Sequence, residues 1–319
     1  VDLNGFPNID ETFIYAKIKD FHINKADAQD FISQLSNRPV ILPKELSRLG
    51  IVKYSGNITG FFSNMVAYGN ITTDLGSLNT DILIKLENKL KDLSYNGTIR
   101  TDNFQLGRLL ATNTLGKVAF KLNTQGGKLH KKSFQGTVKA DVSEIYLNKY
   151  NYKEIALDGK YDGNGFDGKV NINDANLKAK FDGMVDLTKK LPVLNFELLL
   201  EHADIHALNL TNQYVGSNLS FHGSTNMVGN SLDNLNGYLL VDSIRFDNGG
   251  KSLAINQLLF ESQVEKKTSR FTITSDLING YFAGDFKYST IPQTVSALLR
   301  NYIPALSGVN IAGNKRVNV

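Results

Sequence analysis

The residues best suited to metal chemistry are His202, Asp204 and His206, which alternate in the run His-Ala-Asp-Ile-His. Alternate residues of a β-strand point to the same face, so a strand over this run would place all three side chains together. Two imidazoles and a carboxylate could hold zinc. The chain has only five His, however, and no Glu follows at the spacing of a helical zinc motif. We therefore favour solvent-facing polar residues over a metal site.

A glycine-rich run, Gly163-Asn-Gly165-Phe-Asp-Gly168, has the letters of a dinucleotide-binding fingerprint. That fingerprint works only between a strand and a helix, whose N-terminus holds the pyrophosphate. Here Val170 and Ile172 continue the alternation of a strand. The run therefore predicts a hairpin turn.

The same stretch carries Asp158, Asp162 and Asp167, which resemble the acidic positions of a calcium loop. The twelfth position counted from Asp162 is Asn173 in place of the bidentate Glu, which argues against calcium. The sequence has no Gly-x-Ser-x-Gly elbow, His-Glu-x-x-His motif or P-loop, and no Cys for a thiol nucleophile, a metal or a disulfide. We predict a protein that is not an enzyme and has no metal or other cofactor, apart from a bound phospholipid or similar acyl-chain ligand.

Composition narrows the class further. Of the 319 residues 41% are hydrophobic, which is enough for a core, while the mean hydropathy of −0.21 suits strands buried on one face only. The net charge of +4 is mild, and the lysines alternate with acids on the faces opposite the aromatic residues. Nucleic-acid binding would need a basic stripe with aromatic residues on the same face, so we exclude it.

One five-residue pattern returns along the chain: a large apolar residue, any residue, Gly, any residue, and a large apolar residue. Its copies are YSGNI at 54–58, YNGTI at 95–99, FQGTV at 134–138, LDGKY at 157–161, FDGKV at 166–170, FDGMV at 181–185, LNGYL at 235–239 and FAGDF at 282–286. In a strand, the Gly shares a face with both apolar residues. Repeated glycines predict a sheet that bends toward its apolar face. Such a gutter suits a ligand with an acyl chain.

Alternation and turn signals give the rest of the architecture. Most of the chain alternates as strand, and Asn/Gly-rich runs at 123–127, 162–165 and 248–250 predict turns between strands. We therefore predict an all-β fold, mainly β with two short helical segments, elongated and curved around an apolar concave interior. We expect one continuous unit with an N-terminal strand and amphipathic helices at 1–50, the repeating β-groove at 51–289 and an amphipathic helix and tail at 290–319.

Helical periodicity appears near both ends. Ala28, Phe31, Ile32 and Leu35 form a stripe, and a short second helix is predicted at 43–49. A C-terminal helix at 292–306 has one apolar stripe, made of Val295, Leu298, Leu299, Tyr302 and Ile303. This helix could be a lid over the groove, a partner-binding helix, or a cover for exposed sheet.

No run approaches the ~18–20 apolar residues that span a bilayer, and no signal peptide is visible. The chain begins with Val1, so we expect a processed or excised piece from which a membrane anchor has been removed.

The block at 134–210 resembles the repeat units of the TamB group in the AsmA-like superfamily, in its Asn- and Lys-rich Bacteroidota form. The resemblance rests on the runs FQGTVKADV at 134–142, YNYKEIALDG at 150–159, LPVLNF at 191–196 and ADIHALNL at 203–210, and extends loosely over 51–286. It implies a β-taco, a long U-folded sheet whose interior holds lipid tails in the periplasm of a Gram-negative bacterium. It also implies an inner-membrane anchor absent from this chain, an outer-membrane barrel partner of the TamA type, and a role in phospholipid transport and outer-membrane biogenesis.

Pattern and resemblance together predict which residues line the groove: Tyr95, Ile99, Val118, Phe120, Phe134, Val138, Phe166, Val170, Phe181, Val185, Phe196, Leu198, Phe282 and Phe286. The leading hypothesis is a protein that binds or conducts phospholipid acyl chains between two membranes. The alternatives are a scaffold that pairs its sheet edges with client strands of outer-membrane proteins, a surface β-solenoid adhesin with a closed core, and a transmembrane barrel.

Overall fold

The computed structural model describes residues 1–6, 8, 11–36, 39–87, 92–128, 134–265 and 268–284. Phe286 and the C-terminal helix predicted at 292–306, with its stripe of apolar residues, lie outside the described residues. In the described part of the chain, no helix combines the length and the apolar character needed to cross a membrane.

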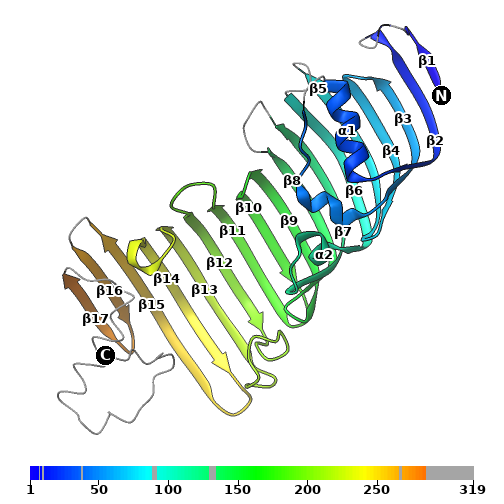
Figure 1. Cartoon of the computed structure of the whole chain (residues 1–319). Coiled ribbons are helices and arrows are strands. Elements are labelled where there is room, and N and C mark those ends of the chain that lie inside the picture. The colour runs from blue at the N-terminus through cyan, green and yellow to red at the C-terminus, as the bar shows by residue number, and fades with distance from the viewer. Residues whose placement is uncertain are drawn as a thin grey trace, which may run out of the picture.

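The described residues form one open antiparallel sheet of seventeen strands, in which each strand pairs with the next in the sequence. The sheet is a long, twisted and curved ribbon (Figure 1), so the predicted elongated all-β fold is confirmed. The strands are β1 (Asp2–Asn4), β2 (Phe13–Ile23), β3 (Val52–Phe61), β4 (Asn64–Thr73), β5 (Gly76–Glu87), β6 (Asp92–Gln105), β7 (Leu115–Lys128), β8 (Gln135–Leu147), β9 (Tyr150–Asp162), β10 (Gly165–Asn173), β11 (Leu177–Asp186), β12 (Val193–Ala203), β13 (Asn218–Val228), β14 (Asn236–Asp247), β15 (Ser252–Val264), β16 (Ser269–Ser275) and β17 (Asn279–Gly284).

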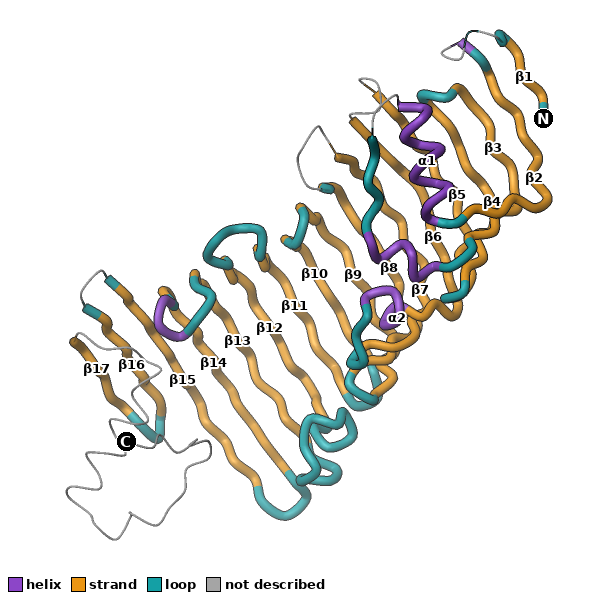
Figure 2. Tube along the Cα trace, in the orientation of Figure 1, coloured by secondary structure: helices purple, strands orange, loops and turns teal. Residues whose placement is uncertain are grey.

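Among the described residues, helices occur mainly in the N-terminal half. α1 (Lys25–Ser36) confirms the predicted first helix, and η2 (Lys44–Leu49) is a 3₁₀-helix where the second was expected. The stripe predicted for α1 is only partly packed, since Ala28 and Ile32 are half-buried while Phe31 is 58% exposed. α2 (Leu106–Leu110) was not predicted, and η3 (Leu232–Asn234) is a single turn. Figure 2 shows α1, η2 and α2 gathered over one stretch of the sheet.

A small core forms where these helices meet the sheet. Leu75, Phe104 and Val118 are buried there, and Leu49 of η2 and Leu109 of α2 pack against them. The described elements otherwise pack mainly against their neighbours in sequence, so most of the sheet is a single layer. Each strand is therefore held by its two flanking strands and by the side chains that the three share.

Glycines on the apolar face mark where the sheet is bent. Gly168 of β10 pairs with Gly159 of β9 and with Gly183 of β11, so three glycines lie side by side. A Cβ built on Gly168 would lie 2.5 Å from the Cα of Gly159 and 2.4 Å from the carbonyl oxygen of Asp158. Cβ atoms of a flat sheet stand clear of neighbouring backbone, so this approach means that the sheet is concave on the side to which that Cβ would point.

The run at 123–127 is not a turn, contrary to the sequence prediction, because β7 continues through it to Lys128. Gly126 pairs with Tyr95 on one side and with Gly136 on the other. The turns predicted at 162–165 and 248–250 are confirmed, since residues Gly163 and Asn164 link β9 to β10 and Asn248 to Lys251 link β14 to β15. Glycine therefore occurs both in turns and inside strands. Inside β7, Gly126 is required because the neighbouring strand approaches it closely.

A second line of bending runs parallel to the first. The strand register shifts beside one row of paired residues, which contains Thr101, Phe120, Val142, Ile155, Ile172, Ala179 and Leu200. Shifts occur between Thr101 and Phe104, between Lys178 and Ala179, and beyond Leu200. Such bulges bend a strand and increase its twist. Where they occur, glycines and bulges bend the strands along their length, which gives this part of the ribbon its trough-like section.

Candidate functional site: the apolar face

The strand register assembles the predicted groove residues into rows on one face of the sheet. The first row contains Tyr95, Tyr161, Phe166 and Val185, with Gly126 and Gly136 between the two tyrosines. The second contains Val138 and Phe196, and the third Ile99, Val170, Phe181 and Leu198. Phe282 continues the first row at β17, next to Phe271.

Three predicted residues differ from this pattern. Val118 is 3% exposed and belongs to the core under α2 and η2, so it supports the face and offers no surface to a ligand. Phe120 packs against the same core. Phe134 precedes β8 and is 45% exposed, with its ring 6.3 Å from that of Tyr95.

Aromatic rings follow each other along the face. The centroid of Phe181 lies 6.4 Å from that of Phe166 and 5.1 Å from that of Phe196. Farther along, Phe271 lies 4.6 Å from Phe260 and 6.2 Å from Phe282. Ring pairs at these separations attract each other beyond the effect of area burial alone. The rings therefore form an apolar strip in two segments, one on β10 to β12 and one on β15 to β17. Between them the row of paired residues holds Thr225 and Leu239.

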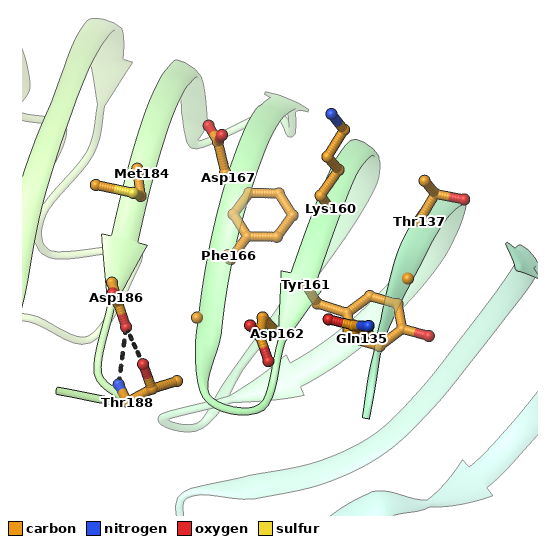
Figure 3. Close-up of a pocket in the computed structure, with 12 residues that line it drawn as sticks. Gln135, Thr137, Lys160, Tyr161, Asp162, Phe166, Asp167, Met184, Asp186 and Thr188 are labelled. Carbon is orange, nitrogen blue, oxygen red and sulfur yellow. Dashed lines mark hydrogen bonds between the residues drawn. The ribbon is translucent and has the colours of Figure 1, made fainter. Parts of the chain in front are cut away.

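A hollow lies at the β9–β10 turn, at one end of strands β8 to β11 (Figure 3). Its volume is about 460 Å³, and Tyr161 and Phe166 line it together with the acidic residues Asp162 and Asp186. Asp186 accepts hydrogen bonds from the backbone and hydroxyl of Thr188, which lower the pKa of its carboxyl group. Asp162 and Asp186 follow Tyr161 and Val185 in their strands, so both carboxylates belong to the face opposite the apolar rows, where Asp186 also pairs with Lys189.

Two tyrosines of the first row meet across β7 and β8. Tyr95 of β6 and Tyr161 of β9 are separated by two whole strands, and their hydroxyls nevertheless form a hydrogen bond. Figure 3 shows the ring of Tyr161 extending from β9 toward β8. A Cβ on Gly126 or Gly136 would lie 2.8 Å or 2.7 Å from the Tyr161 hydroxyl, so only glycine leaves room for this crossing. Burial and the hydrogen bond with Tyr161 raise the pKa of Tyr95, which keeps its phenol neutral.

The opposite face carries the charge. Lys169 lies 2.6 Å from Asp182 on the next strand, and Lys139 lies 3.7 Å from Asp158. Both are cross-strand pairs in register, and their exposed charges contribute little stability. They keep one face hydrated while the other is apolar.

The strand assumed to hold His202, Asp204 and His206 on one face does not continue through them, because β12 ends at Ala203. Asp204 instead accepts hydrogen bonds from the backbone nitrogens of His206 and Ala207, each at 3.0 Å, and so caps a turn. His202 bonds Asn218 through Nδ1 at 2.6 Å. Among the described residues, no three His, Cys, Asp or Glu side chains are grouped to hold a metal ion.

Sequence reasoning missed the tyrosine crossing. Its signal was present, since Tyr95 begins one copy of the glycine pattern and Tyr161 ends another. The pattern does not give the strand register, and it is the register that aligns Tyr95 with Tyr161 across β7 and β8. No family model, curated protein or solved structure matches the chain.

Proposed function

We propose that this chain holds acyl chains of phospholipids along its apolar face, as part of lipid movement between two membranes. The observation that carries the proposal is the aromatic strip on the concave side of a single-layer sheet whose opposite face bears the ion pairs. The periplasmic location, the inner-membrane anchor in a longer protein and the outer-membrane barrel partner of the TamA type are part of this proposal. They rest on the resemblance of 134–210 to TamB repeats.

Physical chemistry favours an acyl chain over a compact ligand. Large apolar residues such as Phe282 and Leu239 remain 43% and 37% exposed in a sheet without a second layer. Covering such surface yields roughly 25 cal/mol per Å², and each methylene that leaves water yields about 0.8 kcal/mol. A long, narrow strip collects this energy best from a long, narrow ligand. Ten methylenes laid on it would gain about 8 kcal/mol before the cost of immobilising the chain.

The proposal is tested by placing one negative charge on either face. Phe181→Asp puts a carboxylate between Phe166 and Phe196, where it must displace lipid or be protonated. Asn171→Asp is the matched control, since it adds the same charge on the neighbouring strand, on the hydrated face, opposite Lys180. Native mass spectrometry with extraction of bound lipid should show loss of lipid only for Phe181→Asp. Purified chain without lipid, or equal lipid in both variants, would contradict the proposal.

The scaffold alternative has one observation in its favour. Among the described residues β17 pairs only with β16, and Leu277, Ile278 and Tyr281 beside this edge are 66%, 60% and 67% exposed. An open edge can accept a further strand from a client. Protection of the β17 amides from hydrogen exchange by an outer-membrane protein strand, with no lipid bound to the chain, would favour this alternative. The adhesin hypothesis required a closed apolar core, whereas the sheet is open.

A further inference from the structure

The hydroxyls of Tyr95, Tyr161 and Thr124 form a polar cluster on the apolar face, in its first and second rows. Thr124 and Tyr161 oxygens are 3.4 Å apart, and Thr124 also donates to the carbonyl oxygen of Thr137 at 2.9 Å. Thr124 belongs to the second row, beside the row of the two tyrosines. A ligand that follows the first two rows from β10 toward β6 passes over these three hydroxyls.

The cluster does not use all its hydrogen-bonding capacity. Each hydroxyl has one hydrogen and two acceptor sites. The hydrogen of Thr124 goes to Thr137, and only one tyrosine can donate to the other. If the remaining phenolic hydrogen belongs to Tyr161, its acceptor is Thr124 Oγ1 at 3.4 Å, which is too long for a good O–H···O bond. If it belongs to Tyr95, the neighbouring hydroxyl is again that of Thr124. A purely aliphatic ligand would cover this hydrogen and leave it without a good partner.

We propose that this cluster is a hydrogen-bonding subsite for the ester carbonyl at the head of an acyl chain. The proposal rests on the lipid-binding function proposed above. A carbonyl oxygen accepts the free phenolic hydrogen, while the methylenes beyond it lie on the ring of Phe166 and the strip that continues to Phe181. Because Gly126 and Gly136 leave room for Tyr161 at this one place, the subsite also fixes where along the ribbon the head of the chain rests. The cluster thereby selects esters over hydrocarbons and gives the ligand a register.

Tyr54 offers a matched control within the chain. Its ring also lies near a glycine, with its hydroxyl 2.9 Å from a Cβ built on Gly56. That hydroxyl is 3.0 Å from the carbonyl oxygen of Asn57 and 3.2 Å from that of Tyr68, so it already has good acceptors. Tyr54→Phe therefore removes a phenolic hydroxyl from the same face without removing a hydrogen-bond donor that lacks a good acceptor.

The test uses the full chain after lipid removal, with 1-anilinonaphthalene-8-sulfonate as the reporter of the apolar face. Methyl dodecanoate, dodecanoate and dodecane compete with the dye, and the ester-to-alkane affinity ratio is measured for each variant. One net hydrogen bond of ordinary strength predicts that Tyr95→Phe/Tyr161→Phe lowers this ratio by about 2- to 12-fold. Tyr54→Phe should leave the ratio as in the parent protein. Circular dichroism and the thermal midpoint establish that each variant is folded.

The outcomes separate the subsite from the function on which it rests. If all three compounds displace the dye and the double variant keeps the parent's ester-to-alkane ratio, the groove stands and the subsite is refuted. If only dodecanoate weakens, the cluster binds a carboxylate and the ester assignment is wrong. If Tyr54→Phe lowers the ratio equally, the effect belongs to tyrosines in general. If none of the three compounds competes with the dye, both proposals fail.

Discussion

The glycines of the apolar face provide the sharpest test of how the sheet is curved. Gly168→Ala would place a Cβ 2.4 Å from the carbonyl oxygen of Asp158, whereas ordinary contacts begin at 3.4 Å. Strands β9 and β10 must therefore separate locally by about 1.0 Å (3.4 − 2.4), at an overpacking cost of typically ~1–3 kcal/mol. Alanine also restricts the unfolded chain, which offsets about 0.4–1 kcal/mol. We expect a net destabilisation of about 1–2 kcal/mol.

Gly280→Ala is the control, because Gly280 lies in the same row of paired residues as Gly168, seven strands away. No atom lies within 4 Å of a Cβ built there, so this variant should be neutral or more stable by up to about 1 kcal/mol. Urea unfolding compares the midpoints, and hydrogen exchange of the β9 to β11 amides localises the effect. Equal midpoints for the two variants, with unchanged exchange in β9 to β11, would refute the close approach of β9 and β10 and the curvature inferred from it.

Three further outcomes are expected. Asp174→Ala should destabilise the chain by about 3 kcal/mol or more in urea unfolding, because the buried carboxylate accepts three hydrogen bonds; a loss below about 1 kcal/mol would contradict this. Glu144→Gln should make the free energy of unfolding less dependent on pH below about 4.5. Hydrogen bonds from Asn151 and Lys117 lower the pKa of Glu144, and their contribution to stability is lost as the carboxylate is protonated. An unchanged fall of stability with decreasing pH would contradict this. Deletion of 290–319 should increase bound lipid or dye if the predicted lid exists, and unchanged binding of both would end that idea.

Much of the fold could be predicted because its information is local. Phe166, Val170, Phe181 and Val185 alternate with polar residues, and period-two alternation decides which face each side chain takes whatever strand lies next to it. Sequential pairing then adds no further choice, since every described strand follows its neighbour in an antiparallel meander. The apolar face is therefore visible in the sequence, because local alternation defines it within each strand and pairing of sequential strands extends it.

The two wrong predictions, a turn at 123–127 and a strand over 202–206, have a common cause: the structure there depends on contacts that local sequence does not reveal. Gly126 and Gly127 have the composition of a turn, and only Tyr95 on the neighbouring β6 and Tyr161 on β9 show why they lie inside β7. The end of β12 is likewise set by Asp204, whose carboxylate captures two backbone nitrogens that a strand would have directed to its neighbour. Alternation in His202-x-Asp204-x-His206 was real, but it carried no information about this competition.

The single-layer construction has a consequence for how the face can work. Since each strand is stabilised mainly by its two neighbours, stability is close to a sum of nearest-neighbour terms, and a local change need not disturb distant strands. The two lines of bending are also independent, because glycines act through close approach and bulges through an extra residue. A polar crossing such as Tyr95–Tyr161 can therefore interrupt the apolar strip without loss of the trough on either side. The ribbon can therefore carry local differences in ligand preference along one face, as the lipid-binding function proposed above would require.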